Sequence, residues 1–156
     1  MEKTKPSLTP DEFRFVVERV KLISIDLVLV APDGRILVGR RNYEPARGSF
    51  FLPGGCIWKQ ETRRQAFDRL LATEVGLEAD FDQAVFLGVF DHHYDANRFG
   101  DPAFGTDYIA MGYRVQLPHL PELDLDDQHS EIRWATATEL LAAPDVHDYT
   151  KAYLRL

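Results

Sequence analysis

The length, composition and charge of the chain exclude several classes of protein. Its 156 residues, 45% hydrophobic and 28% charged, suit one globular domain over residues 1–156 with a proper core. A net charge of −7 opposes broad binding to nucleic acid or anionic membranes, because attraction to phosphate supplies most of that affinity. The apolar runs are far shorter than the ~20 residues of a membrane helix. Without a signal-peptide pattern, and with Cys56 as the single cysteine, we expect a cytoplasmic protein.

The first half of the chain predicts a helix, a hairpin, a strand and a second helix. A Thr-Pro-Asp start and apolar residues at helical spacing predict a helix within residues 7–23. Two β-branched, apolar runs flank a Pro-Asp-Gly turn, which predicts a hairpin over residues 24–41. Residues 50–55 form a further apolar strand candidate, and from Glu61 onward the apolar period becomes that of a helix.

The second half of the chain adds strands and a helical end. Residues 84–94 and 107–117 are strand candidates, separated by a Gly-, Pro- and Asp-containing loop. Residues 131–136 form a short strand, and residues 137–156 form helical turns broken at Pro144. This order of elements predicts an α/β or α+β fold, in which a mixed β-sheet is sandwiched between helices.

The segment PGGCIWKQETRRQAFDRLLATEVGL, from Pro53 to Leu77, places a double glycine before the second helix. Glu74 lies four residues beyond Leu70 and so continues the buried edge of that helix, where a carboxylate needs a partner. Glycine allows close backbone approach, and a backbone carbonyl with a carboxylate suits a hard cation such as Mg²⁺. The simpler interpretation is a tight turn followed by solvated helix residues.

The spacing of this segment resembles the Nudix box. The matching positions, with five residues after the glycine and seven before the arginine, are Gly55, Glu61, Arg69, Leu71, Glu74, Gly76 and Leu77. We therefore expect the Nudix fold. The general pattern has glutamates where this chain has Leu70 and Thr73, which removes two carboxylates from the usual metal cluster. Fewer anionic ligands hold fewer cations, so we expect one essential Mg²⁺, with Mn²⁺ as a substitute.

The same two losses occur in the GDP-mannose mannosyl hydrolase branch of the Nudix superfamily. The segments that look like its characteristic ones, in the same order, are SIDLVLV, ILVGRRNYEPARGSFFLPGG, RLLATEVGL, FGTDYIAMGYR, DDQHSEIRW and VHDYTKAY. The resemblance implies metal-dependent hydrolysis of GDP-mannose or GDP-glucose, in which water attacks the anomeric carbon and GDP and free sugar are released. It also implies a nucleotide sugar as binding partner and a homodimer.

The resemblance assigns functions to individual residues. His129 stands at the position of the catalytic base, and an unperturbed imidazole near pKa ~6.5 accepts a proton at neutral pH. Arg41 matches an arginine that contacts the diphosphate, and Arg69 matches the box arginine, which orients the helix carboxylates. The implied metal ligands are the Gly54 carbonyl, Glu74 and the side-chain oxygen of Gln128. The implied substrate-binding residues include Asp26, Tyr108 and His92, with Asp95 and Asn97 near the sugar by the same matching.

Each of these residues also has an ordinary interpretation, as a solvated loop histidine, an edge-strand charge or a hydrogen-bonding core residue. One departure from the branch concerns the phosphates, because Cys56 stands where the compared members carry an arginine. Arg40, Arg47 or Arg63 are candidates for the missing charge, and we count Arg40 with the substrate-binding residues. Two other functions stay open: a Nudix diphosphatase that cleaves at phosphorus, and a nucleotide-sugar binding module without catalysis.

Overall fold

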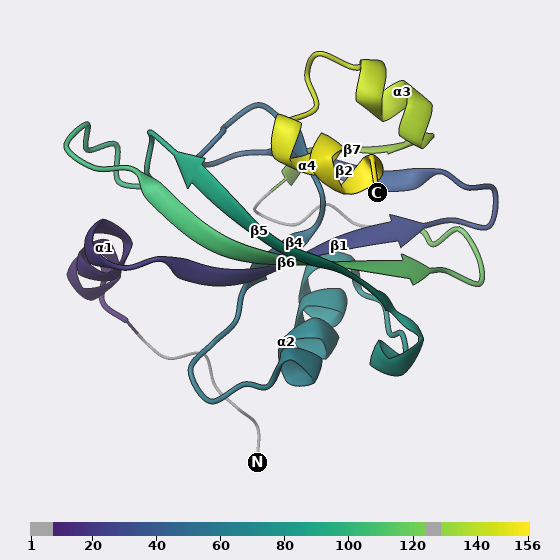
Figure 1. The fold of residues 1–156 in the computed structure, drawn as a ribbon, viewed down its shortest axis with the longest axis horizontal. Helices are drawn as coiled ribbons and strands as arrows, with labels where there is room; N and C mark the ends of the chain where they lie inside the picture. The colour runs from purple at the N-terminus through teal and green to yellow at the C-terminus, as the bar shows by residue number, and fades with distance from the viewer. Residues whose placement is uncertain (1–7, 124–128) are drawn as a thin grey trace.

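The computed structural model describes residues 8–123 and 129–156 (Figure 1). The elements in chain order are α1 (Pro10–Arg19), β1 (Leu22–Val30), β2 (Ile36–Arg41), β3 (Phe50–Phe51), β4 (Gly54–Cys56), α2 (Arg63–Leu70), the π-helical turn η1 (Leu71–Val75), the 3-10 turn η2 (Phe81–Gln83), β5 (Val85–Tyr94), β6 (Thr106–Gln116), β7 (His129–Ala135), α3 (Ala137–Ala142) and α4 (Asp148–Leu154).

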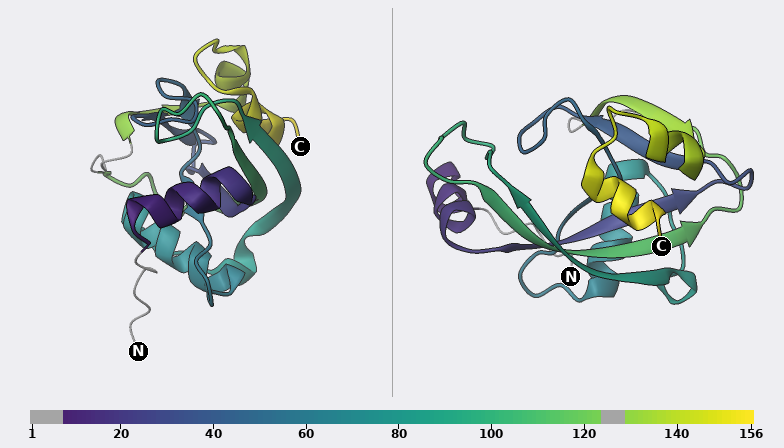
Figure 2. Two further views of the ribbon diagram at one scale, coloured as in Figure 1. Left: turned by 90° about the vertical axis from the view of Figure 1, so that its left-hand side faces the viewer. Right: turned by 45° about the horizontal axis from the view of Figure 1, so that its top comes forward.

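The strands form one mixed sheet. Its order is β3-β2-β1-β6-β5, with β4 also beside β1 and β7 beside β2. β1 and β6 run parallel, whereas the other pairs are antiparallel. Figure 1 and Figure 2 show α2 on one side of the sheet and α3 and α4 on the other. The expected mixed sheet between helices is therefore confirmed.

Alternation along β1 sends its side chains to two separate cores. Ile25 is fully buried and packs with Phe67 of α2 in one cluster. Val28 belongs to the other cluster, which includes Tyr153 of α4. Asp26 lies on the same face of β1 as Val28, so the fold places a carboxylate on the side of the sheet that α4 covers.

Three helices, α1, α2 and α3, begin with the same N-terminal capping motif. Thr9, Thr62 and Thr136 each accept a hydrogen bond from the backbone three residues later, and the glutamate or glutamine there bonds back to the threonine N–H. This capping box satisfies backbone donors that a helix start leaves unpaired. In the part of the chain that the structure describes, no helix is both long and apolar enough to cross a membrane.

The predicted hairpin forms its turn, but its strands pair only at the tip. Val30 and Ile36 are Cα partners, and beyond them β2 pairs with β7 and β3. β4 lies beside β1 instead, with Gly54 opposite Asp26. The separation of β2 from β1 thus brings the double glycine next to an acidic side chain.

Two other predicted elements differ in detail. Residues 50–55 form two short strands and not one, because Pro53 cannot donate to a ladder and the chain passes from β2 to β1 there. The helix after Glu61 starts at Arg63 and continues past Leu70 as a π-helical turn, which ends at Gly76 with φ of 66°. Such turns inside helices are frequent at functional sites.

Candidate active site

Asp26 lies in a row of glycines that crosses the sheet. Its Cα partners are Gly54 in β4 and Gly112 in β6, and Gly112 pairs in turn with Gly88 in β5. A Cβ on Gly54 would lie 2.2 Å from the Ile25 carbonyl oxygen and 2.9 Å from Asp26 Oδ1, so this approach requires glycine. Because neither neighbouring strand places a side chain beside it, the Asp26 carboxylate meets groups from other elements.

Two of those groups come from α4 and β5. The Tyr153 hydroxyl donates a hydrogen bond of 2.8 Å to Asp26 Oδ2, and His92 Nδ1 lies 4.0 Å from the same oxygen. Burial raises the pKa of Asp26 to about 6, an effect that the Tyr153 hydrogen bond and the charge of Arg41 oppose. Asp26 is therefore a carboxyl group that changes its charge close to neutral pH.

Arg41, the last residue of β2, places a positive charge close to Asp26 and to Tyr108 of β6. A hydrogen bond from Arg41 and its positive charge both favour the ionised form of Tyr108, but burial dominates and raises the pKa of Tyr108 to about 12. Tyr108 is thus a neutral hydroxyl at physiological pH. Burial also raises the pKa values of Asp26 and of Tyr94, and the charge of Arg41 opposes that rise in both. The structure therefore brings together three of the residues predicted to bind substrate.

His92, a fourth predicted residue, joins this group from β5. Its Cα partner is Tyr108, and its ring stacks on Tyr149 with 4.1 Å between the centroids and an interplanar angle of 7°. The side chain is 7% exposed, and burial lowers the pKa of His92 to about 4, so the imidazole is neutral at pH 7. Among the described residues, nothing hydrogen-bonds its buried Nε2 atom.

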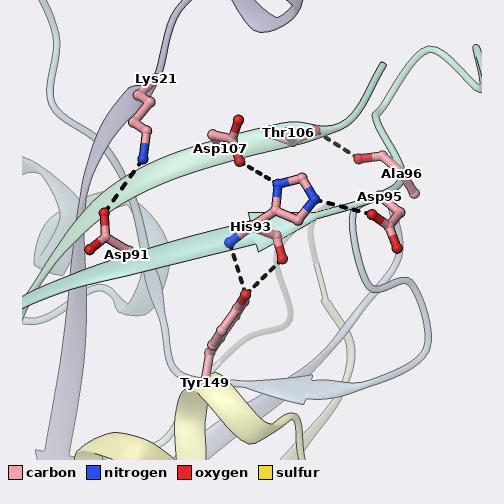
Figure 3. A network of polar contacts seen from close by, with 8 residues as sticks. All are labelled: Lys21, Asp91, His93, Asp95, Ala96, Thr106, Asp107 and Tyr149. Atoms are coloured by element: carbon pink, nitrogen blue, oxygen red, sulfur yellow. Dashed lines mark hydrogen bonds and ion pairs between the residues drawn. The ribbon is translucent and has the colours of Figure 1, made fainter. Parts of the chain in front are cut away.

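His93 points to the opposite, exposed side (Figure 3). Its Nδ1 lies 2.5 Å from Asp107 Oδ1 and its Nε2 lies 3.1 Å from Asp95 Oδ1. These carboxylates raise the pKa of His93. Asn97 is buried, and its side chain bonds backbone groups of the loop 99–104. The contacts described for Asp95 and Asn97 therefore hold the loop between β5 and β6.

Arg69 joins the start of α2 to β4. Its Nε and Nη2 atoms lie 2.7 Å and 3.0 Å from the two carboxylate oxygens of Glu61, and Nη2 also donates to the Cys56 carbonyl at 2.8 Å. The guanidinium stacks on the Trp58 ring, 3.7 Å from the centroid, and the backbone N–H of Trp58 donates to Glu61. This is the geometry of a side chain that fixes the loop between β4 and α2.

The residues present fit an oxygen-ligand site for a metal ion. In the β1–β4 ladder the Leu27 N–H donates to the Pro53 carbonyl, so strand alternation turns the Gly54 and Cys56 carbonyls away from β1. The Gly54 carbonyl is therefore not used by this ladder. Glu74 lies in the π-helical turn after α2, and its Oε2 atom is shielded from solvent. A carbonyl and a carboxylate are ligands that suit Mg²⁺.

The two positions that depart from the Nudix box have other surroundings. Leu70 is 1% exposed, and a Cβ on Gly55 would lie 2.8 Å from Leu70 Cδ2, so apolar packing occupies the place of a carboxylate. Thr73 is exposed. Within residues 8–123 and 129–156, no group of three or more His, Cys, Asp and Glu side chains is arranged to hold a metal ion. Gln128, the third implied ligand, lies outside the described residues.

His129 and Arg40 are placed by their strands. His129 begins β7 and is the Cα partner of Arg41, so the backbone sets the predicted base opposite the predicted phosphate-binding arginine. Arg40 bonds Glu131 at 3.1 Å and the Gly48 carbonyl at 2.9 Å. Adjacent arginines of β2 thus have different partners, and the substrate-binding function of Arg40 stays a prediction.

Sequence reasoning missed Tyr149 and Tyr153, which contact His92 and Asp26. Both lie in the segment VHDYTKAY, whose resemblance to the branch was noted without a function for either tyrosine, and their spacing of four residues puts them on one helix face. It also missed Gly112, where a Cβ would lie 2.4 Å from the Tyr153 ring. That requirement becomes visible only when α4 is packed on β6.

The mixed sheet, the glycine turn before α2 and the Arg69–Glu61 pair together define a Nudix fold. The family model described as NUDIX domain matches residues 20–156, so the chain belongs to this family of hydrolases.

One relative and two solved structures illustrate the similarity. The low-salt glycan biosynthesis protein Agl8 of Haloferax volcanii is 32% identical over 155 residues, which cover 98% of this chain and 92% of that protein. The crystal structure of a MutT protein from Methanosarcina mazei Go1 matches with a TM-score of 0.69 and 18% identity, over 86% of this chain and 91% of that one. A MutT NUDIX hydrolase from Burkholderia pseudomallei matches with a TM-score of 0.68 and 26% identity, over 86% and 96% of the two chains.

Proposed function

We propose that the protein hydrolyses a GDP-sugar, GDP-mannose or GDP-glucose, to GDP and free sugar by attack of water on the anomeric carbon. The observation that carries the proposal is the group formed by Arg41, Tyr108, Asp26 and His92 on one face of the sheet. A guanidinium and a neutral phenol suit phosphate oxygens, whereas a carboxyl group and a neutral imidazole suit sugar hydroxyls. A nucleotide sugar presents both kinds of group next to each other.

Two similarities support a sugar-linked substrate. The relative from Haloferax volcanii, 32% identical to this chain, is described as a glycan biosynthesis protein. The segments that resemble the GDP-mannose mannosyl hydrolases include the strands that carry Asp26, Arg41 and Tyr108. Both point to a sugar nucleotide in preference to a free nucleoside triphosphate.

In this proposal each residue has the function that suits its chemical group. His129 accepts a proton from the attacking water, and Arg41, across the strand pair from it, binds the diphosphate that leaves. Asp26 and His92 hold the sugar so that its anomeric carbon faces the water. Arg69 acts indirectly, because its contacts with Glu61 and Cys56 fix the segment that contains Gly54. Arg40 is the candidate for a second cation near the phosphates.

The Gly54 carbonyl, Glu74 and Gln128 would hold one Mg²⁺, or Mn²⁺ in its place. When bound, this ion supplies positive charge that neutralises the departing diphosphate. The loss of carboxylates at Leu70 and Thr73 is consistent with a single ion, because a site with little anionic charge does not hold several divalent cations.

A second candidate is hydrolysis at phosphorus, which would release GMP and a sugar 1-phosphate. Cys56 favours it, because the cysteine stands where the resembled branch has an arginine on the leaving diphosphate. Leu70 and Thr73 oppose it, since they reduce the charge available to several metal ions.

Product analysis separates these functions. The purified protein is incubated with GDP-mannose and Mg²⁺, with EDTA as the control, and ³¹P NMR and sugar analysis identify the products. We expect GDP and free mannose. GMP with mannose 1-phosphate would assign the second function, and tight binding without metal-dependent turnover would assign a binding module.

We also propose a homodimer, on the strength of the resemblance alone. Sedimentation equilibrium gives the mass directly, with about twice the chain mass of 17.9 kDa expected. A single-chain mass at micromolar concentration would contradict it.

A further inference from the structure

We propose that α4 positions two of the substrate-binding groups: Tyr153 orients Asp26, and Tyr149 orients His92. This inference rests on the proposed function, because it assigns positions for groups that hold the sugar. The two tyrosines lie four residues apart, on the face of α4 that packs against β1 and β5.

Tyr153 reaches Asp26 because β6 leaves room for its ring. The side chain is 3% exposed, and its ring crosses Gly112, where a Cβ would lie 2.4 Å from Cε1. Gly112 is the Cα partner of Asp26, so the gap opens beside the carboxylate itself. The hydroxyl then donates to Oδ2 at 2.8 Å. One glycine and one tyrosine thus fix the rotation of the Asp26 side chain.

Tyr149 fixes the neighbouring imidazole in a different way. Its ring lies nearly parallel to that of His92 at 4.1 Å. Its hydroxyl accepts a hydrogen bond of 2.8 Å from the His93 N–H and donates one of 2.7 Å to the His93 carbonyl, as Figure 3 shows. Stacking sets the plane of His92, and the two backbone hydrogen bonds hold α4 against β5.

The start of α4 is itself anchored. His147 caps the helix by accepting from the Tyr149 N–H at 3.1 Å, and its ring stacks on Phe51 at 4.5 Å. The His147 N–H also donates to the Phe50 carbonyl. These contacts hold α4 to β3, next to β2 and Arg41, so the helix has little freedom to move away from the site.

This arrangement leaves one polar atom of each substrate-binding group beside the tyrosines but not bonded to them. Tyr153 engages Asp26 Oδ2, whereas the other carboxylate oxygen, Oδ1, lies next to Gly54. His92 keeps Nε2 buried and, among the described residues, without a hydrogen bond. Both atoms are set by α4 and suit hydroxyl groups of a sugar at fixed positions.

The test removes one hydroxyl at a time. Tyr153→Phe keeps the ring over Gly112, and Tyr149→Phe keeps the ring on His92. The matched control is Tyr113→Phe, a buried tyrosine of β6 that faces α2 and whose hydroxyl accepts from Arg63 at 3.2 Å. Steady-state kinetics with GDP-mannose and Mg²⁺ and calorimetric titration with GDP are measured for all three.

Positioning predicts that turnover falls while nucleotide binding does not. We expect kcat/KM to fall about tenfold or more in Tyr153→Phe and severalfold in Tyr149→Phe, with the affinity for GDP within about twofold of the wild type. Tyr113→Phe stays within about twofold in both. Tyrosine variants of α4 that behave like Tyr113→Phe, or that lose GDP affinity as much as turnover, would overturn the proposal.

A measurement independent of activity separates this proposal from the proposed function. The His92 imidazole is titrated by NMR in the wild type, in Tyr149→Leu and in Tyr113→Phe. The titratable groups that face it are Asp26 of β1 and Tyr149 and Tyr153 of α4, and the charges of Asp91 on β5 and of His147, the N-cap of α4, also act on it. Loss of the stacked ring in Tyr149→Leu exposes the imidazole to water, so the midpoint of the His92 titration should rise in this variant and not in Tyr113→Phe. An unchanged midpoint refutes the positioning of His92, whether or not GDP-mannose is a substrate.

Discussion

Arg69 binds both carboxylate oxygens of Glu61, at 2.7 Å and 3.0 Å, in a pair whose side chains are 17% and 4% exposed. Removal of one partner leaves the other charge buried, so Glu61→Ala should lower the free energy of unfolding by about 3 kcal/mol, as measured by urea denaturation. The control is Asp82→Ala, which breaks the exposed ion pair with Arg64 and should have a much smaller effect. Equal losses would show that the buried pair does not stabilise the loop before α2.

Gly54→Ala should be among the most damaging small substitutions in the chain. The added methyl group would lie 2.2 Å from the Ile25 carbonyl oxygen, so β4 must move away from β1. We expect the free energy of unfolding to fall by about 3 kcal/mol or more, and turnover to be lost as well. Gly100→Ala is the control, since its Cβ meets no atom and it bears only the strain of a φ of 68°, about 1 kcal/mol. A mild Gly54→Ala would mean that the two strands do not approach so closely.

The neutral state of His92 makes stability depend on pH. Its pKa is lowered to about 4 in the folded chain, so between about pH 6.5 and pH 4 the unfolded chain binds a proton that the folded chain does not. The free energy of unfolding should therefore fall as the pH falls through this window. His92→Gln should remove this part of the slope, up to about 1.4 kcal/mol per pH unit, in urea denaturation at several pH values.

His93→Gln is the control for that slope because its effect has the opposite sign. Asp107 and Asp95 raise the pKa of His93, so its contribution to stability is complete below the unfolded value near 6.5 and is lost as the pH rises through the folded value. His93→Gln should thus lose more stability in acid than in base. Identical pH slopes in the two variants would contradict both assignments.

Arg41 should matter for nucleotide affinity more than an arginine elsewhere on the same hairpin. Arg41→Ala removes the guanidinium that acts on Asp26, Tyr94 and Tyr108, and we expect GDP binding with Mg²⁺ to weaken about tenfold or more by calorimetry. Arg35→Ala serves as the control, because that side chain bonds Asp33 in the exposed turn. If Arg41→Ala and Arg35→Ala bind GDP with the same affinity, Arg41 does not bind the phosphates.

Much of the fold was predictable because its signals are local. The Thr-Pro-Asp start at Thr9, the Pro-Asp-Gly turn and the helical period after Glu61 depend on neighbouring residues, and the element that each predicts appears close to its expected place. The separation of β2 from β1 was not predictable, because it results from competition by β7 and β4, which lie far away in sequence.

In the candidate site, too, residues that share one segment were predictable, whereas contacts between distant segments were not. Arg69 and Glu61 share one segment, and the resemblance to the Nudix box included both residues, with Arg69 orienting carboxylates; the pair itself is seen in the structure. The glycine row through Asp26 depends on strand register, and the contacts of Tyr149 and Tyr153 depend on the packing of the last helix, neither of which a single sequence reveals. Gln128 lies outside the described residues, and of His129 only the strand position is described.

The position of bond cleavage tests the central claim most directly. GDP-mannose is incubated with the protein and Mg²⁺ in water enriched in ¹⁸O, and ³¹P NMR follows the β-phosphate signal of any GDP formed. Attack at the anomeric carbon predicts GDP without ¹⁸O and therefore no isotope shift. An isotope shift of that signal, or GMP as product, would show attack at phosphorus and contradict the account.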